Sequence, residues 1–332
     1  MNARPVRSAG VWALGVIALG ALLAPWIAPH DPNARFPDLL NAPPTRIRVV
    51  DAGGGWRAPF VRPWTRVSQL EQRYEENRAE AIALTWFGGG TLVRSSDEAR
   101  APLLLLGADG FGRDVFTRLL YGARTSLALA VVAALGATVL GGLVGAFAGY
   151  AGGSLDEALM RASEFVLVLP TMYVALALRA VMPLVLPAST VFLLLAAIFT
   201  VVGAPFISRG VRGIVRSERQ RDYAAAAASL GAGHVRVVSR HLLPAARGFV
   251  AAQLTMLVPA FVVTEATLSF VGLGFPSDVA SWGTMLQDAS TIRAISDFPW
   301  LLSPAVAIFV VVFSLNVTLQ GRHGVMSYDR PM

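Results

Sequence analysis

The sequence predicts an all-α polytopic membrane protein, with six membrane-spanning helices and a long external insert between the first and the second. Of its 332 residues, 55% are hydrophobic and only 15% are charged, and its mean hydropathy is +0.57. A soluble domain of this length would carry more charge, so several membrane spans are expected. Within hydrocarbon, a single apolar run satisfies its own backbone polar groups only as a helix.

Six apolar runs are long enough, or nearly so, to cross the roughly 30 Å of hydrocarbon that about 20 helical residues span. They are residues 9–28, 126–150, 159–181, 190–207, 249–273 and 300–319. We interpret the first run as a retained span rather than a signal peptide, because Pro25 and Trp26 stand where a small-residue cleavage site would be needed. The second run contains the glycines that favour close helix–helix approach, namely Gly136, Gly141, Gly142 and Gly145.

Arginine placement predicts the orientation of these spans. All 28 basic residues are arginine, and they are most concentrated in the loop 209–247 after the fourth run. Cytoplasmic loops carry the excess of positive charge, so this loop is expected in the cytoplasm. Counting spans from there predicts a multi-pass membrane protein with both termini, including the tail 321–332, in the cytoplasm. The same reasoning explains the net charge of +7 without nucleic acid.

The residues that are missing exclude several kinds of chemistry. Without cysteine there are no disulfides, thiolate metal sites or cysteine nucleophiles. Without lysine the chain has neither a P-loop lysine nor a Schiff-base amine, so a nucleotide that drives this protein would be bound by another chain. The scattered histidines have no metal-ligand spacing: His30, His234, His241 and His323. We therefore expect no enzyme, no bound cofactor and no metal site.

The insert between the first two spans, residues 29–124, is too long for a plain connector and is expected to form a small external α+β cap. Two short strands are predicted around the glycine turn at Gly53–Gly55, and a short helix is predicted to begin near Ser68 and Gln72. An unfolded insertion is the alternative. The other predicted parts are the tail and first span (1–28) and a five-helix core (125–320).

The cytoplasmic loop 209–247 is predicted to contain two helices. Ser217 and Gln220 have the spacing of a capping box, so the first helix would begin at Glu218, continue through the alanines 224–228 and end at Gly231. The second would run over residues 234–242 and be closed by Pro244. It would place three apolar residues on one face, namely Val235, Val238 and Leu242.

An exposed alanine face lets another backbone approach closely, so the first of these helices has the character of a docking element. The alternative is an ordinary hairpin that is rich in alanine because the genome is rich in GC. The segment resembles the EAA loop of ABC-importer permeases, in which Glu-Ala-Ala precedes a glycine and a later Leu-Pro pair. Ala225 stands where that family has its glutamate, so a charged contact from this position is not expected.

This resemblance implies a set of residues that couple the permease to its ATPases. They are Asp222, Tyr223, Ala225, Ala226, Ala227, Gly231, His241, Leu243 and Pro244. Further segments are similar to dipeptide, oligopeptide and nickel permeases: residues 106–127, 264–274 and 281–286, with Asp156, Met160, Arg161, Glu164, Pro170, Arg209, Arg212 and Gly213. Only residues 30–105 and the tail after Gly321 lack a counterpart in shorter members of the family.

The resemblance implies a permease subunit of the bacterial inner membrane that works with a sister permease, two ATP-binding cassette ATPases and an extracytoplasmic binding protein. ATP and Mg would be bound by the ATPases. Peptides of the dipeptide and oligopeptide class are the expected substrates, with nickel chelates or modified peptides of the microcin C type as alternatives. A carrier or channel that works without ATP is the alternative of another class.

Three residues are candidates for the translocation path. Glu265 is an ionisable residue inside the fifth run, where such groups face a water cavity or another helix. A helix–helix hydrogen bond is the simpler role for it. Ser269 and Trp282 belong to the segments that resemble the family, and an interfacial position would also explain Trp282. Arg161 and Glu164 are expected to pair with each other.

Overall fold

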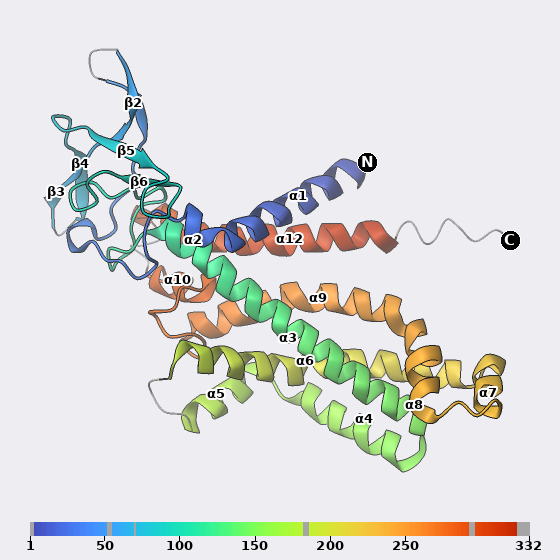
Figure 1. The fold of residues 1–332 in the computed structure, drawn as a ribbon. Coiled ribbons are helices and arrows are strands. Elements are labelled where there is room, and N and C mark those ends of the chain that lie inside the picture. The colour runs from blue at the N-terminus through green and yellow to red at the C-terminus, as the bar shows by residue number, and fades with distance from the viewer. Residues whose placement is uncertain (1–2, 52–54, 70, 182–185, 292–295, 324–332) are drawn as a thin grey trace. The chain divides into compact units, whose positions relative to one another are not determined.

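The computed structural model describes residues 3–51, 55–69, 71–181, 186–291 and 296–323. The chain divides into two compact units. The helical unit is built on Leu127–Leu268, with parts of the first and last helices. The strand-containing unit comprises Val11–Ser126 and Ser269–Val311. Figure 1 identifies the helices and strands of both.

Four helical stretches among the described residues are long and apolar enough to cross a membrane: Val115–Ala151, Ala188–Arg219, His234–Phe270 and Pro299–Thr318. They correspond to helices α3 (Val115–Ala151), α6 (Ala188–Arg219), α9 (Leu243–Phe270) and α12 (Ser303–His323), with the short helical turns that precede the last two. The second, fourth, fifth and sixth predicted spans are thus helical. The first predicted span overlaps α1 (Ala3–Leu22), whose described apolar part Ser8–Leu22 is shorter than the four stretches above, and contains α2 (Ala24–Ile27).

The third predicted span is not one helix. It is divided into α4 (Gly153–Val168) and α5 (Thr171–Val181), so the prediction of a single run over residues 159–181 was wrong. Leu169 between them is extended, with ψ 114°. Pro170 explains the break, because proline disfavours the helical conformation of the residue before it and has no N–H to donate.

The helical unit is held together by a glycine contact between α3 and α6. A side chain at Gly141 or Gly145 would overlap the carbonyl oxygens of Ala204 and Ser208 on α6, and one at Gly149 would lie 2.6 Å from the carbonyl oxygen of Arg212. The close approach predicted for this run is therefore present, with two differences. Among the described residues, Gly142 has no atom within 4 Å of the position a side chain would take, and Gly149 was not predicted.

The insert is built of strands. A sheet has the order β1-β2-β5-β6, and a second pair is β3–β4. The bounds are β1 Arg48–Val50, β2 Trp56–Val61, β3 Trp64–Ser68, β4 Arg73–Glu76, β5 Ile82–Trp86 and β6 Val93–Ser95. The predicted strand pair is confirmed, since Val50 lies opposite Trp56; residues 52–54 of the predicted turn lie outside the described residues.

The helix predicted from Ser68 was wrong. β3 ends at Ser68, and the chain turns back through Gln72, whose φ of 51° is left-handed, into β4. The side chain of Asn41 donates to the Gln72 amide oxygen at 2.6 Å, and the β3–β4 ladder pairs Trp64 with Glu76. The β3–β4 ladder and this contact with a residue distant in the chain outweigh the local helix propensity of the segment.

Buried charges connect α3 to the segment after α9 within the strand-containing unit. Arg113 bonds Asp109 at 2.7 Å and Asp288 at 2.6 Å, and Asp288 is the last residue of α10 (Trp282–Asp288). The carbonyl oxygen of Ser277 accepts a further bond from Arg113. Burial raises the pKa of Asp288, and the Arg113 guanidinium opposes that rise. The network orders the start of α3 and the turn around α10 together.

Candidate functional site

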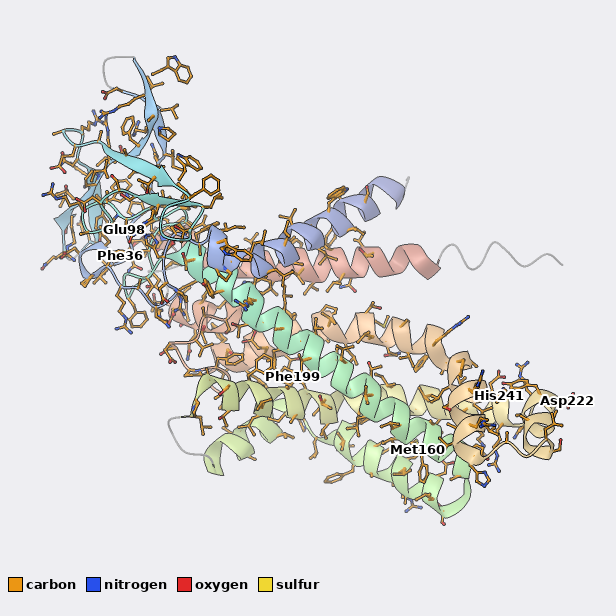
Figure 2. All side chains as sticks on the ribbon, in the orientation of Figure 1. Phe36, Glu98, Met160, Phe199, Asp222 and His241 are labelled. Atoms are coloured by element: carbon orange, nitrogen blue, oxygen red, sulfur yellow. The ribbon has the colours of Figure 1, made fainter. Side chains whose placement is uncertain are left out.

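The docking helix predicted from sequence is α7, Asp222–Ser229. It does not begin at Glu218, because α6 continues to Arg219, and the carbonyl oxygens of Ser217 and Glu218 accept the amides of the next turn. The predicted capping box was therefore wrong: Ser217 lies inside the last turn of a long helix instead of at the start of a new one. Figure 2 labels Asp222 at the start of α7.

The end of α7 is the one that the sequence predicted. Gly231 has a φ of 84°, a left-handed conformation that glycine adopts without strain. The amide of Ala232 donates to the carbonyl oxygen of Ala227 at 3.1 Å, and that of Leu230 to Ala226 at 3.1 Å. This six-to-one bond around a left-handed glycine is the Schellman arrangement, so Gly231 sets the direction in which the chain leaves α7.

The alanines of α7 divide into a buried and an exposed face. Ala224 is buried, whereas Ala225 and Ala226 are exposed and Ala227 is half-buried. Asp222 is exposed as well, and Tyr223 donates its hydroxyl to Glu218 at 2.6 Å. That hydrogen bond raises the pKa of Tyr223. The exposed surface of α7 therefore includes the small side chains of Ala225 and Ala226.

The second predicted helix is continuous with the fifth span. α8 (His234–Arg236) leads into the π-helical turn Val237–Leu242 and then α9, so Pro244 does not close it. The amide of Leu243 reaches back five residues to Val238. This wider turn explains how the helix continues past a proline. The backbone hydrogen bonds before Pro244 span five residues instead of four, so the four-residue bond that a proline removes is already absent there.

The same turn changes which side chains face inward. Val237 and Leu242 are buried, while Val235 is 82% exposed, so the predicted apolar face of Val235, Val238 and Leu242 was partly wrong. His241 and Leu243 are half-buried and Pro244 is exposed. Asp222 and His241 lie in the same part of the helical unit (Figure 2).

Tyr150, near the end of α3, contacts both ends of the segment 219–234 that contains α7, here called the α7 hairpin. Its hydroxyl lies 2.6 Å from Nδ1 of His234, after the hairpin. Arg219, before the hairpin, donates to the carbonyl oxygen of Tyr150 and places its guanidinium 5.0 Å from the centre of the Tyr150 ring. Neither Tyr150 nor Arg219 was predicted, since no local motif links residues this far apart in the chain.

An ion pair connects α4 to α6 close to this hairpin. Arg212 donates to both carboxylate oxygens of Asp156, to Oδ2 at 2.6 Å. This hydrogen bonding lowers the pKa of Asp156. The pairing predicted between Arg161 and Glu164 was wrong, because Arg161 bonds Glu157 at 2.5 Å and Glu164 faces Arg209 at 3.4 Å. Asp156 and Arg212 thus tie the start of α4 to the helix that leads into α7.

A pocket of about 470 Å³ lies beside the break at Pro170, between the end of α4, the start of α5 and the middle of α6 and α9. Phe199 of α6, labelled in Figure 2, stacks on Phe261 of α9 in its wall with 5.2 Å between ring centres. Its polar side chains are Thr171, Gln253 and Thr264, and none of the described residues that line it is charged. Non-helical backbone inside a membrane is tolerated where it is buried in protein or lines a cavity.

The three path candidates fall in different surroundings. Glu265 is fully buried in the helical unit and follows Thr264 of the pocket wall. Ser269 and Trp282 belong to the strand-containing unit. The hydroxyl of Ser269 accepts the amide of Phe275 at 3.2 Å, and the indole of Trp282 donates to the carbonyl oxygen of Leu119 at 3.2 Å. Both side chains are buried and order the turn between α9 and α10.

Comparison with known proteins identifies the family. Residues 141–323, more than half of the chain, match the family described as binding-protein-dependent transport system inner membrane component. Residues 4–44 match the N-terminal TM domain of oligopeptide transport permease C. The first match contains α7, the pocket and Glu265, and the second contains α1.

Individual relatives agree with this assignment. The oligopeptide transport system permease protein OppC of Bacillus subtilis is 36% identical over 216 residues, which are 65% of this chain and 68% of that protein. The dipeptide transport system permease protein DppC of the same organism is 37% identical over 215 residues, 65% of each chain. The OppC protein of Lactococcus lactis is 31% identical over 223 residues, 66% of this chain and 74% of that protein. The chain therefore belongs to the family of binding-protein-dependent transport inner membrane components.

Proposed function

We propose that this chain is the transmembrane permease subunit of an ATP-driven ABC importer for peptides of the dipeptide and oligopeptide class. The observation that carries the proposal is α7, a short helix with an outward face of Ala225 and Ala226 that is held at both ends by Tyr150. The names of the relatives, oligopeptide and dipeptide transport permeases, support the substrate class.

The proposed topology has six spans with both termini in the cytoplasm of a bacterial cell. α1, the broken pair α4–α5 and the four long apolar helices would be these spans. From Leu159 on, the pair α4–α5 would cross the membrane as two half-helices joined at Pro170. The insert 29–124 would then form the external cap, 125–320 the permease core and 321–332 a cytoplasmic tail.

In the proposed mechanism the ATPase subunits bind the outward face of α7. The contact residues would be Asp222, Tyr223, Ala225, Ala226 and Ala227, while Gly231 fixes the direction of the chain after α7. ATP and Mg would be bound by the ATPases, and this chain would hold no cofactor and catalyse no reaction. Closure of the two ATPases would move α7 as a unit.

Three connections would carry that movement to the spans. The π-helical turn with His241, Leu243 and Pro244 leads from α7 into α9. Tyr150 connects the hairpin to α3, and Arg212 with Asp156 connects α6 to α4. A two-state shift of packed helices, rather than bending within one helix, would then open the path to one side of the membrane at a time.

The pocket beside Pro170 would be this chain's part of the path, with a sister permease supplying the rest. Its uncharged wall suits neutral and apolar parts of a peptide, and Gln253 and Thr264 could bond peptide groups. Glu265 would contribute next to Thr264. For Ser269 and Trp282 we propose path contacts on the family resemblance alone; within the strand-containing unit they order the turn between α9 and α10.

The decisive experiment is reconstitution of this chain with its sister permease, two ATPase subunits and an extracytoplasmic binding protein in proteoliposomes. We expect ATP hydrolysis to rise when the binding protein is loaded with a di- or oligopeptide, and labelled peptide to accumulate only with ATP. Loading with a nickel chelate or a modified peptide tests the alternative substrates. Peptide uptake without the ATPases, or failure of the chain to co-purify with them, would overturn the proposal in favour of a carrier or channel.

A further inference from the structure

The turn between β5 and β6 presents large apolar side chains on its surface. Trp86 ends β5 and is 53% exposed, Phe87 follows it at 79%, and Leu92 at the start of the return is 39% exposed. The turn between them consists of glycines and Thr91. Neighbouring exposed aromatic side chains of this size mark an interaction surface rather than ordinary surface scatter.

Phe87 adopts a conformation that bulky residues avoid. Its φ of 55° is left-handed, although three glycines follow it at which the chain could have made the same turn without strain. Its amide donates to the carbonyl oxygen of Leu92 at 3.0 Å, which closes the hairpin in this form. This arrangement has two costs, the strained backbone and the exposure of an aromatic ring to solvent. Backbone strain of this kind is retained mainly at functional positions.

The turn is fixed to the end of the first apolar helix. The amide of Leu92 donates to the carbonyl oxygen of Trp26 at 2.6 Å, and both residues lie in the strand-containing unit. Trp26, in α2, is 61% exposed. The helix before it carries exposed apolar residues every three or four positions: Trp12, Val16, Leu19 and Leu22. An apolar helix face and the aromatic turn are thus joined by a hydrogen bond.

We propose that Trp86, Phe87 and Leu92, here called the aromatic rim, lie in the interfacial layer of the lipid bilayer beside the outer end of α1. Lipid is the occupant because the rim is anchored where the apolar helix face ends. Tryptophan and phenylalanine are also the residues that bilayer interfaces favour. The rim would be a second membrane anchor of the insert. The inference goes beyond the transport function and rests only on the membrane location of α1.

The absence of cysteine makes a direct test simple, because each single-cysteine variant has no background. Spin labels are placed at Phe87→Cys, at Leu19→Cys on the apolar face of α1 as the lipid reference, and at Glu80→Cys, exposed on the β4–β5 loop, as the water reference. The permease pair is placed in phosphatidylglycerol–phosphatidylcholine nanodiscs. Accessibility to oxygen and to a water-soluble nickel chelate is then measured by electron paramagnetic resonance.

The label at position 87 is expected to have an oxygen-to-nickel accessibility ratio close to that at position 19 and well above that at position 80. A ratio equal to that at position 80 would place the rim in water and overturn the proposal. Shielding from both reagents would overturn it too, because a protein surface would then cover the rim. Unchanged peptide uptake by these variants separates failure of this inference from failure of the transport function.

An independent measurement covers the case in which Phe87→Cys does not fold. Lipids brominated near the headgroup quench tryptophans at the interface, and the quenching of the wild type is compared with that of Trp86→Phe in the same nanodiscs. The substitution is expected to remove a quenchable component of the fluorescence. The difference in intensity between the wild type and the variant reports Trp86 alone; if that difference is the same in brominated and unbrominated lipid, Trp86 is remote from lipid and the proposal is wrong.

Discussion

Two regions of the helical unit are built of small residues, and they differ in whether those residues have a partner in this chain. On α3 the glycines lie against the backbone of α6, and Gly141, Gly145 and Gly149 leave no room for a side chain. On α7 the alanines are divided, and Ala225 and Ala226 face outward. Small side chains allow close approach in both places.

The difference teaches how to interpret such runs. A stripe of small residues predicts a close approach of another backbone. The burial of the stripe indicates whether that backbone belongs to the same chain or to another protein. The α3 stripe is covered by the chain's own backbone, so its role is to hold the fold. The described residues leave the α7 face of Ala225 and Ala226 exposed, and the role that we propose for it is to receive another protein. Substitutions in the two regions should therefore damage different properties.

The largest effect is expected in the covered region. Gly145→Leu would force a side chain into the Ser208 carbonyl and the Val211 side chain, and overpacking of this kind typically costs about 1–3 kcal/mol. Most of the protein should then be lost as aggregate in size-exclusion chromatography after detergent extraction. Gly142→Leu is the matched control, since nothing lies within 4 Å of the new side chain's first atom. Equal yields of the two variants would contradict the α3–α6 contact.

A smaller effect, and of another kind, is expected at the end of the uncovered helix. Gly231→Leu puts a side chain on a left-handed residue, which costs about 1–2 kcal/mol. It does so without a clash in the part of the chain that the structure describes, where no atom lies within 4 Å. Membrane insertion and yield should be unchanged. Affinity for the ATPase subunits should fall about tenfold, because the docking form of α7 becomes less populated.

Gly233 provides the control for that variant. It lies two residues further, also has open space around it, and has an ordinary φ of −64° that any residue can adopt. Gly233→Leu should therefore retain ATPase binding in the same titration. If Gly231→Leu binds the ATPases and couples to them as well as Gly233→Leu does, the left-handed turn has no part in docking. The proposed docking role of α7 would then lose this support.

The ion pair that ties α4 to α6, the helix that leads into α7, is tested at Asp156. Asp156→Asn weakens its bonds to Arg212 and is expected to reduce the free energy of unfolding by about 1 kcal/mol, because solvent reaches part of the guanidinium. The pKa of Asp156 is lowered in the folded state, so this stability is present above the unfolded pKa of about 3.9 and is lost as pH falls through the folded pKa. The variant should therefore lose part of the acid sensitivity of the wild type.

Thermal unfolding followed by tryptophan fluorescence at pH 7 and below pH 4 checks this expectation. Glu157→Gln is the control, because Glu157 is the neighbouring acid and its pair with Arg161 is exposed on both sides. No change in unfolding is expected from it. A wild type and an Asp156→Asn variant with the same midpoint at both pH values would mean that the ion pair contributes nothing.

Much of this architecture could be predicted from the sequence because its signals are local. Long apolar runs predicted the helices α3, α6, α9 and α12, and a glycine after an alanine run predicted the left-handed residue at 231. Glycine spacing on α3 predicted a close contact, although it could not separate Gly142 from Gly149. That distinction depends on where α6 lies, which no local pattern contains.

The errors came from residues whose role depends on the rest of the chain. Pro170 and Pro244 have the same local chemistry, yet Pro170 divides a predicted span and Pro244 follows a π-helical turn within a continuous helix. Ser217 and Gln220 have the spacing of a helix start, but α6 continues through Ser217. The anchors of α7, Tyr150 and Arg219, are joined across 69 positions of the chain. Such contacts follow from packing and leave no motif.

The smallest effect is expected where this chain departs from its family, at Ala225. Ala225→Glu introduces the acid of the family's motif on an exposed position of α7. A single exposed ion pair contributes about 0–1 kcal/mol, so affinity for the ATPases should change by less than about fivefold. Ala225→Gln, of similar size but uncharged, separates charge from bulk in the same titration at low and high salt. If the glutamate raised affinity far more than the glutamine, and salt removed the gain, the uncovered face of α7 would depend on charge rather than on the close approach that its alanines allow.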